Sequence, residues 1–205
     1  TAGPTYEAID PVRFIGNRSS GKMGIALALE CANNGGKVHL ILGPTHLECK
    51  HSNVNITRVE SASEMFESVD ENFLDSDVSI FAAAVSDYTP ESVSENKIKK
   101  KNKTLSISFN KTKDILQEMG VKKKDSQFVV GFALETENEI ENAQSKLKRK
   151  NADMIALNSL NNNGAGFKHD TNKISIIDEN NITDFELKDK SEVAADIVAK
   201  IIALN

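Results

Sequence analysis

Short apolar runs alternate with amphipathic stretches along most of the chain. Near-continuous apolar or regularly alternating segments occur at 38–43, 54–59, 78–85, 128–133 and 153–158. Runs of this kind predict strands, and the nearly unbroken ones are typical of strands buried on both faces of a parallel sheet. Apolar spacing of three to four residues, or a capping-box pattern, predicts helices over 21–30, 61–73 and 136–150. The alternation indicates an α/β fold with a Rossmann-like, doubly wound and mostly parallel sheet.

The last third of the chain has a different pattern. Two alternating segments, 173–178 and 182–187, flank a polar turn and predict a β-hairpin. The stretch 191–204 predicts a closing amphipathic helix, with one apolar stripe made of Val193, Ala194, Ile197, Val198 and Ile201. The asparagine- and glycine-rich stretch 161–166 is expected to be a loop within one domain.

Length and composition indicate a single domain over residues 1–205. The chain begins without an initiating Met, and we expect it to be cut from a longer polypeptide. A formal net charge of −5 disfavours nucleic acid as a partner, and no apolar run or signal peptide indicates a membrane. Cys31 and Cys49 lack metal-ligand spacing and are expected to be free thiols of a reducing, cytoplasmic compartment.

The segment from Gly16 to Met23 contains the most distinctive candidate chemistry. Ser19 and Ser20 stand where a helix N-cap belongs, directly before Gly21 and Lys22. A glycine turn at a helix start can bind phosphate through backbone N–H groups, but an ordinary serine-capped turn has the same sequence pattern. The spacing is that of a Walker loop, yet Met23 replaces the hydroxyl that would hold magnesium.

Three further segments carry candidate site residues. Small residues at 82–84 leave room for a flat ring, and Asp87 is either a sugar-binding carboxylate or a turn cap. The lysine-rich stretch 97–103 is either a solvated loop or a flap that meets phosphates. Lys146 and Lys150 share one helix face, since they are four residues apart.

Together these segments resemble the phosphopantothenate–cysteine ligases. The resemblance covers nearly the whole chain, in the order TAGPT, DPVRFIGNRSSGKMG, AAAVSDY, KIKK and GFALET. In many bacteria this ligase is the C-terminal half of a bifunctional coenzyme A biosynthesis protein. The resemblance implies that 4′-phosphopantothenate is activated by CTP, with Mg²⁺, to an acyl-cytidylate that L-cysteine then captures. It also implies a homodimer and a decarboxylase domain in the same parent chain.

The resemblance assigns roles to individual residues. Catalytic roles fall on Asn17 and Lys97. Contacts with CTP fall on Ser19, Ser20, Gly21, Ala82, Ala83, Asp87, Lys97, Asp114, Ile115, Phe132, Lys146 and Lys150. Contacts with phosphopantothenate fall on Arg13, Asn17 and Ala84. The ligands of the magnesium ion are not assigned.

Two other functions are compatible with an α/β sheet. A nicotinamide-dependent reductase lacks support, because the chain has no G-x-G-x-x-G and has Gly43-Pro44 where an acidic residue would end the second strand. A non-enzymatic module that binds an acidic partner through residues 97–103 remains open. Turnover separates it from the ligase.

Overall fold

A five-stranded sheet forms the centre of the computed structural model, which describes residues 1–99, 104–159 and 169–205. Its strand order is β12-β11-β9-β8-β5. The strands are β5 (Val78–Phe81), β8 (Phe128–Glu135), β9 (Met154–Ser159), β11 (Ile174–Asp178) and β12 (Ile182–Asp184). Strands β5, β8 and β9 are parallel, whereas β11 and β12 form the expected antiparallel hairpin. The α/β prediction is therefore confirmed.

A second parallel pair, β3 (Val38–Leu42) and β4 (Val54–Arg58), is linked to this sheet by the first residues of the chain. Ala2 forms a parallel bridge with Leu42, and Pro4 forms one with Ala84. The N–H of Ala2 donates to the carbonyl of Ile41 at 3.0 Å. The N-terminal segment thus lies between the two parallel units and places the Gly16–Lys22 turn beside the end of β5.

Helices cover both faces of the central sheet. They are α1 (Lys22–Asn33), α2 (Ala62–Phe73), α3 (Ile115–Lys122), α4 (Glu139–Arg149) and α5 (Lys190–Leu204). Helices α1 and α5 pack on one face, around Val130, Met154 and Ile176. Helices α2 and α3 pack around Val129, and α4 packs around Ile155. The stripe predicted for the last helix is buried at all five positions.

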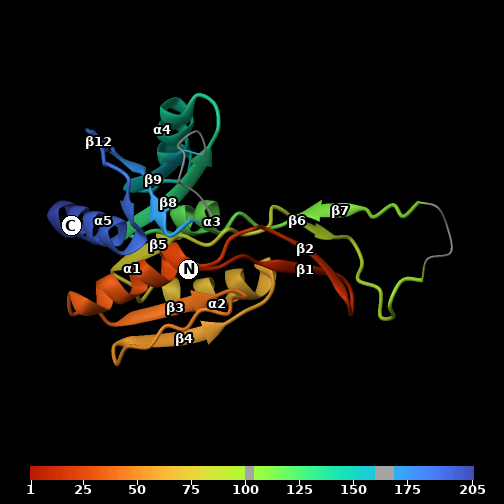
Figure 1. The fold of residues 1–205 in the computed structure, drawn as a ribbon. Helices are drawn as coiled ribbons and strands as arrows, with labels where there is room; N and C mark the ends of the chain where they lie inside the picture. The colour runs from red at the N-terminus through yellow and green to blue at the C-terminus, as the bar shows by residue number, and fades with distance from the viewer. Residues whose placement is uncertain (100–103, 160–168) are drawn as a thin grey trace.

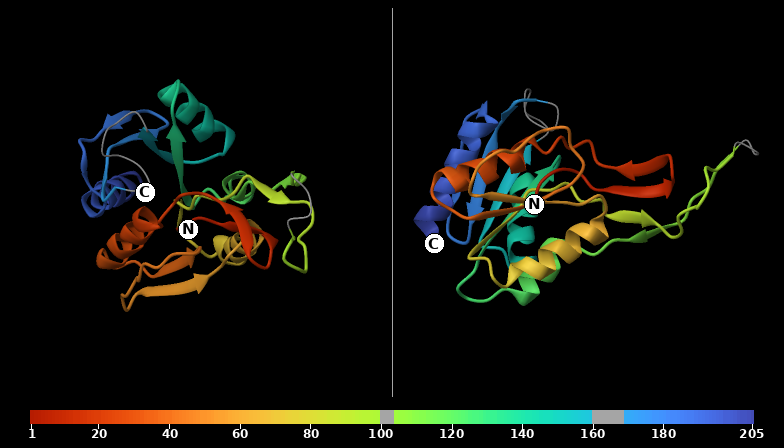
Figure 2. Two further views of the ribbon diagram at one scale, coloured as in Figure 1. Left: turned by 45° about the vertical axis from the view of Figure 1, so that its right-hand side comes forward. Right: turned by 90° about the horizontal axis from the view of Figure 1, so that it is seen from below.

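Two antiparallel ribbons project from the same side of this body (Figures 1 and 2). One pairs β1 (Tyr6–Asp10) with β2 (Arg13–Gly16), and the other pairs β6 (Tyr88–Pro90) with β7 (Phe109–Lys111). A shorter pair joins β10 (Thr171–Asn172) to β13 (Lys188–Asp189). The hydrophobic pattern did not predict these pairs, because their strands are short and their buried positions include polar residues such as Glu7, Asp10 and Asn172.

Several boundaries differ from the prediction. The strand expected over 78–85 ends at Phe81 and is half-buried, since among the described strands only β8 pairs with it. Helix α1 begins after Gly21 rather than after a serine cap, and α4 is preceded by Asn138 rather than Thr136. Helix α3, which Asp114 caps, was not predicted. The loop expected at 161–166 lies outside the described residues.

None of the helices in the described ranges is both long and apolar enough to cross a bilayer.

Candidate functional site

A cavity of about 770 Å³ lies beyond the carboxyl ends of β5 and β8, between the starts of α1 and α3. This is where open α/β sheets bind ligands. Twelve of the residues assigned from the resemblance line it: Asn17, Ser19, Ser20, Gly21, Ala82, Ala83, Ala84, Asp87, Asp114, Ile115, Phe132 and Lys146. Arg13, Lys97 and Lys150 are not among its lining residues. The fold therefore brings most of the predicted site together from five separate segments of the chain.

Asn17 connects the N-terminal turn to the end of β5. Its Nδ2 donates hydrogen bonds to the carbonyls of Ala84, at 2.9 Å, and Val85, at 3.0 Å. The side-chain nitrogen of Asn17 is thus hydrogen-bonded to the backbone after β5. The side-chain oxygen is its other hydrogen-bonding atom, and it can only accept. Asn17 consequently couples the turn before α1 to the small residues that follow β5.

The start of α1 has the geometry of an anion site. Gly21, the N-cap residue, has a φ of 82°, a left-handed conformation that glycine adopts without strain, and it has no side chain with which to cap the helix. The Oγ of Ser19 instead accepts from the N–H of Gly21 at 3.3 Å. The first N–H groups of an α-helix have no partner within it and lie at the positive end of its dipole. The N-cap position is therefore Gly21 and not one of the two serines, and the phosphate interpretation stays a prediction.

Lys146 lies against the strand end that carries Phe132. Its Nζ donates a hydrogen bond of 2.6 Å to the carbonyl oxygen of Phe132. Burial lowers the pKa of Lys146, although Glu135 and Asp114 act in the opposite direction. A partly buried ammonium that lines the cavity can meet a nucleotide through both charge and hydrogen bonding.

Lys150 reaches the cavity only through Asp114. Its Nζ pairs with the Oδ2 of Asp114 and donates to the Oε1 of Gln117 at 3.1 Å. The other oxygen of Asp114 accepts from the N–H of Gln117 at 3.0 Å and so caps α3. Burial opposes ionisation of Asp114, but these hydrogen bonds and the charge of Lys150 hold its pKa below the usual value. Lys150 is thus placed to position Asp114.

Asp87 lies at the mouth of the cavity with its side chain exposed. Its backbone carbonyl accepts from the N–H of Thr112 at 3.0 Å. The hydroxyl of Thr112 in turn donates to the carbonyl of Ser86 at 2.6 Å. These bonds fix the loop after β5 against the segment that leads into α3, so that Asp87 and Asp114 line the same cavity.

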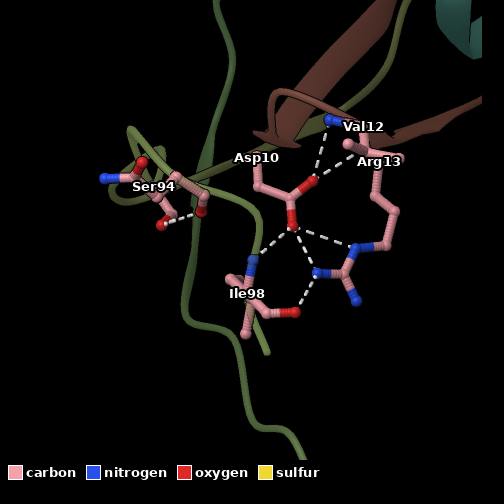
Figure 3. Close-up of polar contacts among 6 residues, drawn as sticks. Asp10, Val12, Arg13, Ser94 and Ile98 are labelled. Carbon is pink, nitrogen blue, oxygen red and sulfur yellow. Dashed lines mark hydrogen bonds and ion pairs between the residues drawn. The ribbon is translucent and has the colours of Figure 1, made fainter. Parts of the chain in front are cut away.

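Arg13 belongs to a polar cluster outside the cavity, on the ribbon of β1 and β2 (Figure 3). Its guanidinium pairs with Asp10 and donates to the carbonyl of Ile98 at 2.9 Å. The Oδ2 of Asp10 also accepts from the N–H of Ile98 at 3.0 Å. The hydrogen bond from Arg13 is the main cause that lowers the pKa of Asp10, and the backbone N–H groups add to it. The cluster anchors the segment that carries Lys97, whose side chain is exposed.

Some polar residues of the cavity were not assigned from the sequence. Lys22, Asn158, Asn172 and Lys190 line it together with the predicted residues. Asn172 and Lys190 lie on a short strand and at a helix start, where neither periodicity nor spacing indicated a site. Among the described residues, no group of three or more His, Cys, Asp or Glu side chains is arranged to hold a metal ion.

The chain is similar to known proteins over nearly its whole length. Residues 1–204 match the family described as the DNA/pantothenate metabolism flavoprotein C-terminal domain. The chain is 56% identical over 204 residues to a cysteine/cysteine sulfinic acid decarboxylase from an unknown prokaryotic organism, covering 99% of this chain and 57% of that protein. It is 45% identical over 202 residues to the coenzyme A biosynthesis bifunctional protein CoaBC of Haemophilus influenzae, covering 98% and 50% of the two.

A solved structure has the same fold. The crystal structure of the C-terminal domain of a CoaBC protein superimposes with a TM-score of 0.83 at 39% identity, covering 99% of this chain and 92% of that one. The chain spans only about half the length of the curated relatives it matches, 57% and 50% for the two above. The similarity therefore concerns one portion of those longer proteins.

Proposed function

The chain belongs to the family of DNA/pantothenate metabolism flavoprotein C-terminal domains, and we propose that it is the ligase that joins 4′-phosphopantothenate to L-cysteine in coenzyme A biosynthesis. One observation carries this proposal: a single cavity at the carboxyl ends of the parallel strands is lined by twelve of the residues expected to bind the substrates. Because those residues come from five separate segments, an unrelated fold would not collect them in one place.

The proposed reaction has two steps. A carboxylate oxygen of phosphopantothenate attacks the α-phosphorus of CTP, and pyrophosphate leaves with the bonding electrons of the broken P–O bond. The amine of L-cysteine then attacks the acyl carbon, loses a proton and displaces CMP, which forms the amide. Neither step requires a nucleophile from the protein, so the chain's task is to position the reactants and offset developing charge.

The cavity suggests how the chain performs this task. The start of α1 supplies positive potential for the nucleotide phosphates. Lys146, which donates to the carbonyl of Phe132, supplies positive charge near the nucleobase. The small side chains at 82–84 leave space for the cytosine ring beside Phe132, and Asp87 is placed to accept from a ribose hydroxyl. We assign Asn17 to the acyl group. Its amide nitrogen donates to the carbonyls of Ala84 and Val85 after β5, and its amide oxygen is the other hydrogen-bonding atom of the side chain.

A magnesium ion is part of the proposal as a companion of the triphosphate. Mg²⁺ usually keeps several waters and binds through one or two carboxylates and substrate phosphates, so it does not need a preformed protein cage. The cavity fits this requirement without a dedicated carboxylate: Asp87 is assigned to the ribose and Asp114 is paired with Lys150, so substrate phosphates and water would supply most of the ligands. When bound, the ion would neutralise phosphate charge.

The proposal includes a homodimer. Exposed apolar side chains gather on the two projecting ribbons and their continuations: Val12, Phe14, Ile15, Tyr88, Val93, Leu105 and Phe109. Tyr6 and Phe14 stack with ring centroids 3.9 Å apart, which gives the first ribbon a flat apolar face. Because every copy of the chain carries the same apolar surface, a second copy is the partner that can cover it. We further propose a cytoplasmic location and a decarboxylase domain in the parent chain.

The relative named cysteine/cysteine sulfinic acid decarboxylase does not favour a different activity for this chain. The decarboxylase activity is stated for a protein of which the chain covers 57%, and the cavity described here is built from the residues expected of the ligase. A polyanion-binding module is the remaining alternative, because the stretch 97–103 is rich in lysine, and Lys97 and Lys99, which the structure describes, are exposed.

Turnover of the purified chain tests the proposal. We expect pyrophosphate release that requires CTP, 4′-phosphopantothenate and Mg²⁺ together, and the amide product once L-cysteine is added. Omitting phosphopantothenate controls for simple CTP hydrolysis. Binding of polyanions of any kind without pyrophosphate release would contradict the ligase and support the module.

A further inference from the structure

The ion pair of Asp10 and Arg13 holds one residue of the segment between β6 and β7 by its backbone (Figure 3). The N–H of Ile98 donates to the Oδ2 of Asp10 at 3.0 Å, and its carbonyl oxygen accepts from the Nη2 of Arg13 at 2.9 Å. These partners are 88 and 85 residues away in the sequence. Because residues 91–99 belong to no helix or strand, the acceptor and donor of this pair replace the neighbouring strand that the segment lacks.

The carboxylate of Asp10 is fixed by its own ribbon. Asp10 is 2% exposed, and its Oδ1 accepts from the N–H groups of Val12 and Arg13, each at 2.9 Å. Its Oδ2 accepts from the Nε of Arg13 at 3.0 Å and from the Nη2. These bonds, with the one from Ile98, offset the cost of burying the charge. An apolar pair could fill the same space, but it could not bind the backbone of Ile98.

Lys97 lies between two attachments to the ribbon of β1 and β2. It directly precedes Ile98, and its side chain is exposed. On its other side, the N–H of Ser94 donates to the carbonyl of Ile9 at 3.0 Å, and the Oγ of Ser94 donates to the carbonyl of Asn96 at 2.7 Å. The backbone around Lys97 is thus held while its ammonium is free to reach a ligand. Such preorganisation reduces the conformational entropy that is lost when the lysine meets a phosphate.

The contacts of Arg13 favour a different role from the substrate contact that the resemblance assigns to it. Its Nε and Nη2 bond to Asp10 and Ile98, and Arg13 is not one of the residues that line the cavity of its own chain. We propose that Asp10 and Arg13 are positioning residues, which hold the backbone at Ile98 so that Lys97 is presented to the reacting phosphates. Neither contacts substrate. The inference rests on the proposed function for the role of Lys97, and it holds whether Lys97 acts in its own cavity or in that of a second copy.

A double-mutant cycle tests whether the pair acts through Lys97. The measurement is single-turnover release of pyrophosphate from CTP and 4′-phosphopantothenate in Asp10→Asn, Lys97→Ala and the double variant. We expect Asp10→Asn to lower the rate at saturating substrates about tenfold and to change the half-saturating concentration of phosphopantothenate by less than about twofold. Because a misplaced Lys97 already contributes little, the double variant should be no slower than Lys97→Ala.

Asp178→Asn is the matched control. Asp178 is 8% exposed, its Oδ1 accepts from the N–H groups of Asn180 and Asn181, and it pairs with Lys200 at 3.1 Å. It closes the turn of the C-terminal hairpin and does not line the cavity. We expect Asp178→Asn to lower the free energy of unfolding without slowing pyrophosphate release.

Two further measurements keep the test independent of folding and of turnover. Arg13→Gln is a second variant for the cycle, because the side chain of Arg13 is 39% exposed and its replacement leaves no large cavity. We expect it to behave as Asp10→Asn does. Amide exchange followed by NMR reports the anchoring directly, and the N–H of Ile98 should exchange faster in Asp10→Asn than in the wild type.

Each failure has its own signature. Losses of rate that multiply in the double variant would overturn the inference, because Asp10 would then act independently of Lys97. A higher half-saturating concentration of phosphopantothenate at an unchanged maximal rate would overturn it in favour of direct substrate contact. Unchanged exchange of Ile98 in Asp10→Asn would overturn it and leave the ligase intact. A wild-type chain without turnover, in which Asp10→Asn still speeds exchange of Ile98, would refute the ligase and support the anchoring.

Discussion

The side-chain nitrogen of Asn17 lies 2.9 Å from the carbonyl oxygen of Ala84, to which it donates a hydrogen bond. This contact joins two segments that are 67 residues apart in the sequence, the turn before α1 and the loop after β5. Because the same nitrogen also bonds to Val85, Asn17 sets the distance between the two walls of the cavity. A residue expected to act on substrate therefore also shapes the site.

This double role predicts the behaviour of Asn17→Asp. A carboxylate cannot donate to Ala84 and Val85, and it places negative charge against two carbonyl oxygens. We expect a loss of about 1 kcal/mol in the free energy of unfolding, since both bonds are exposed, and a fall of more than tenfold in turnover. Rapid-quench measurement of both half-reactions will show accumulation of acyl-cytidylate if capture by cysteine is slowed more.

Asn34→Asp is the matched control for that experiment. Asn34 is also exposed and its Nδ2 also donates two hydrogen bonds, to Glu30, but it lies at the far end of α1 from the cavity. We expect it to lose stability without losing turnover. Equal losses of turnover in the two variants would remove Asn17 from the chemistry.

A pair of lysines on α4 allows a test of the nucleotide side. Lys146 lines the cavity and donates to Phe132, whereas Lys148 is exposed on the same helix. We expect Lys146→Met to raise Kd for CTP about tenfold, because a partly buried ammonium is lost, and Lys148→Met to leave it unchanged. Isothermal titration with CTP decides between them, and equal affinities in both variants would contradict this position for the nucleotide.

The cluster of Asp10 and Arg13 predicts a particular pH dependence. The pKa of Asp10 is lowered in the folded chain, mainly by Arg13, so its stabilising contribution is complete above the ordinary carboxyl pKa of about 3.9. That contribution is lost as pH falls through the lower, folded-state pKa. An NMR titration should find Asp10 ionised well below pH 3.9 in the wild type and a higher pKa in Arg13→Gln.

The free energies of unfolding of wild type and Arg13→Gln should follow the ionisation of Asp10. Wild type and Arg13→Gln are expected to differ most near neutral pH and to converge in strong acid. Exchange of the Ile98 amide should be faster in the variant, because this N–H donates to Asp10. An unchanged pKa for Asp10 in Arg13→Gln would show that the backbone N–H groups alone determine it.

The exposed apolar ribbons predict an effect on association. Val93 is 55% exposed on the long excursion between β6 and β7, and Val121 is 79% exposed near the end of α3. We expect Val93→Asp to shift the chain from dimer to monomer in sedimentation velocity, and Val121→Asp to leave the dimer intact. A chain that is monomeric before any substitution would contradict the homodimer.

The position of Lys97 predicts that two inactive variants can restore activity in a mixed dimer. Its side chain is exposed, and Lys97 is not one of the residues that line the cavity of its own chain. If it acts in the partner's cavity, mixing Lys97→Ala with Asn17→Asp should restore up to about a quarter of wild-type turnover, since half the dimers are mixed and each has one complete site. Mixtures no more active than the separate variants would place Lys97 with its own chain or outside the reaction.

The sequence by itself determined the elements that depend on local periodicity. The strand over 128–133, the C-terminal hairpin and the last helix follow from the alternation of apolar and polar residues, because burial of one face requires that spacing. The resemblance to the ligase family also named twelve residues that line the cavity, which lies at the carboxyl ends of the parallel strands. The strand, the hairpin and the helix depend on neighbours within a few residues, whereas the fold brings the cavity residues together from five separate segments.

The tertiary structure alone decided the remaining contacts. Gly21 is the N-cap of α1 in a left-handed conformation, and a Cβ at this position would lie 3.4 Å from the backbone of Gly3, which belongs to another segment. Lys150 pairs with Asp114, and Lys190 lines the cavity, through helix packing that no short pattern encodes. The physical reason is that a side chain's charge state and partners depend on the whole set of elements packed around it, whereas hydrophobic periodicity reports only which face of an element is buried.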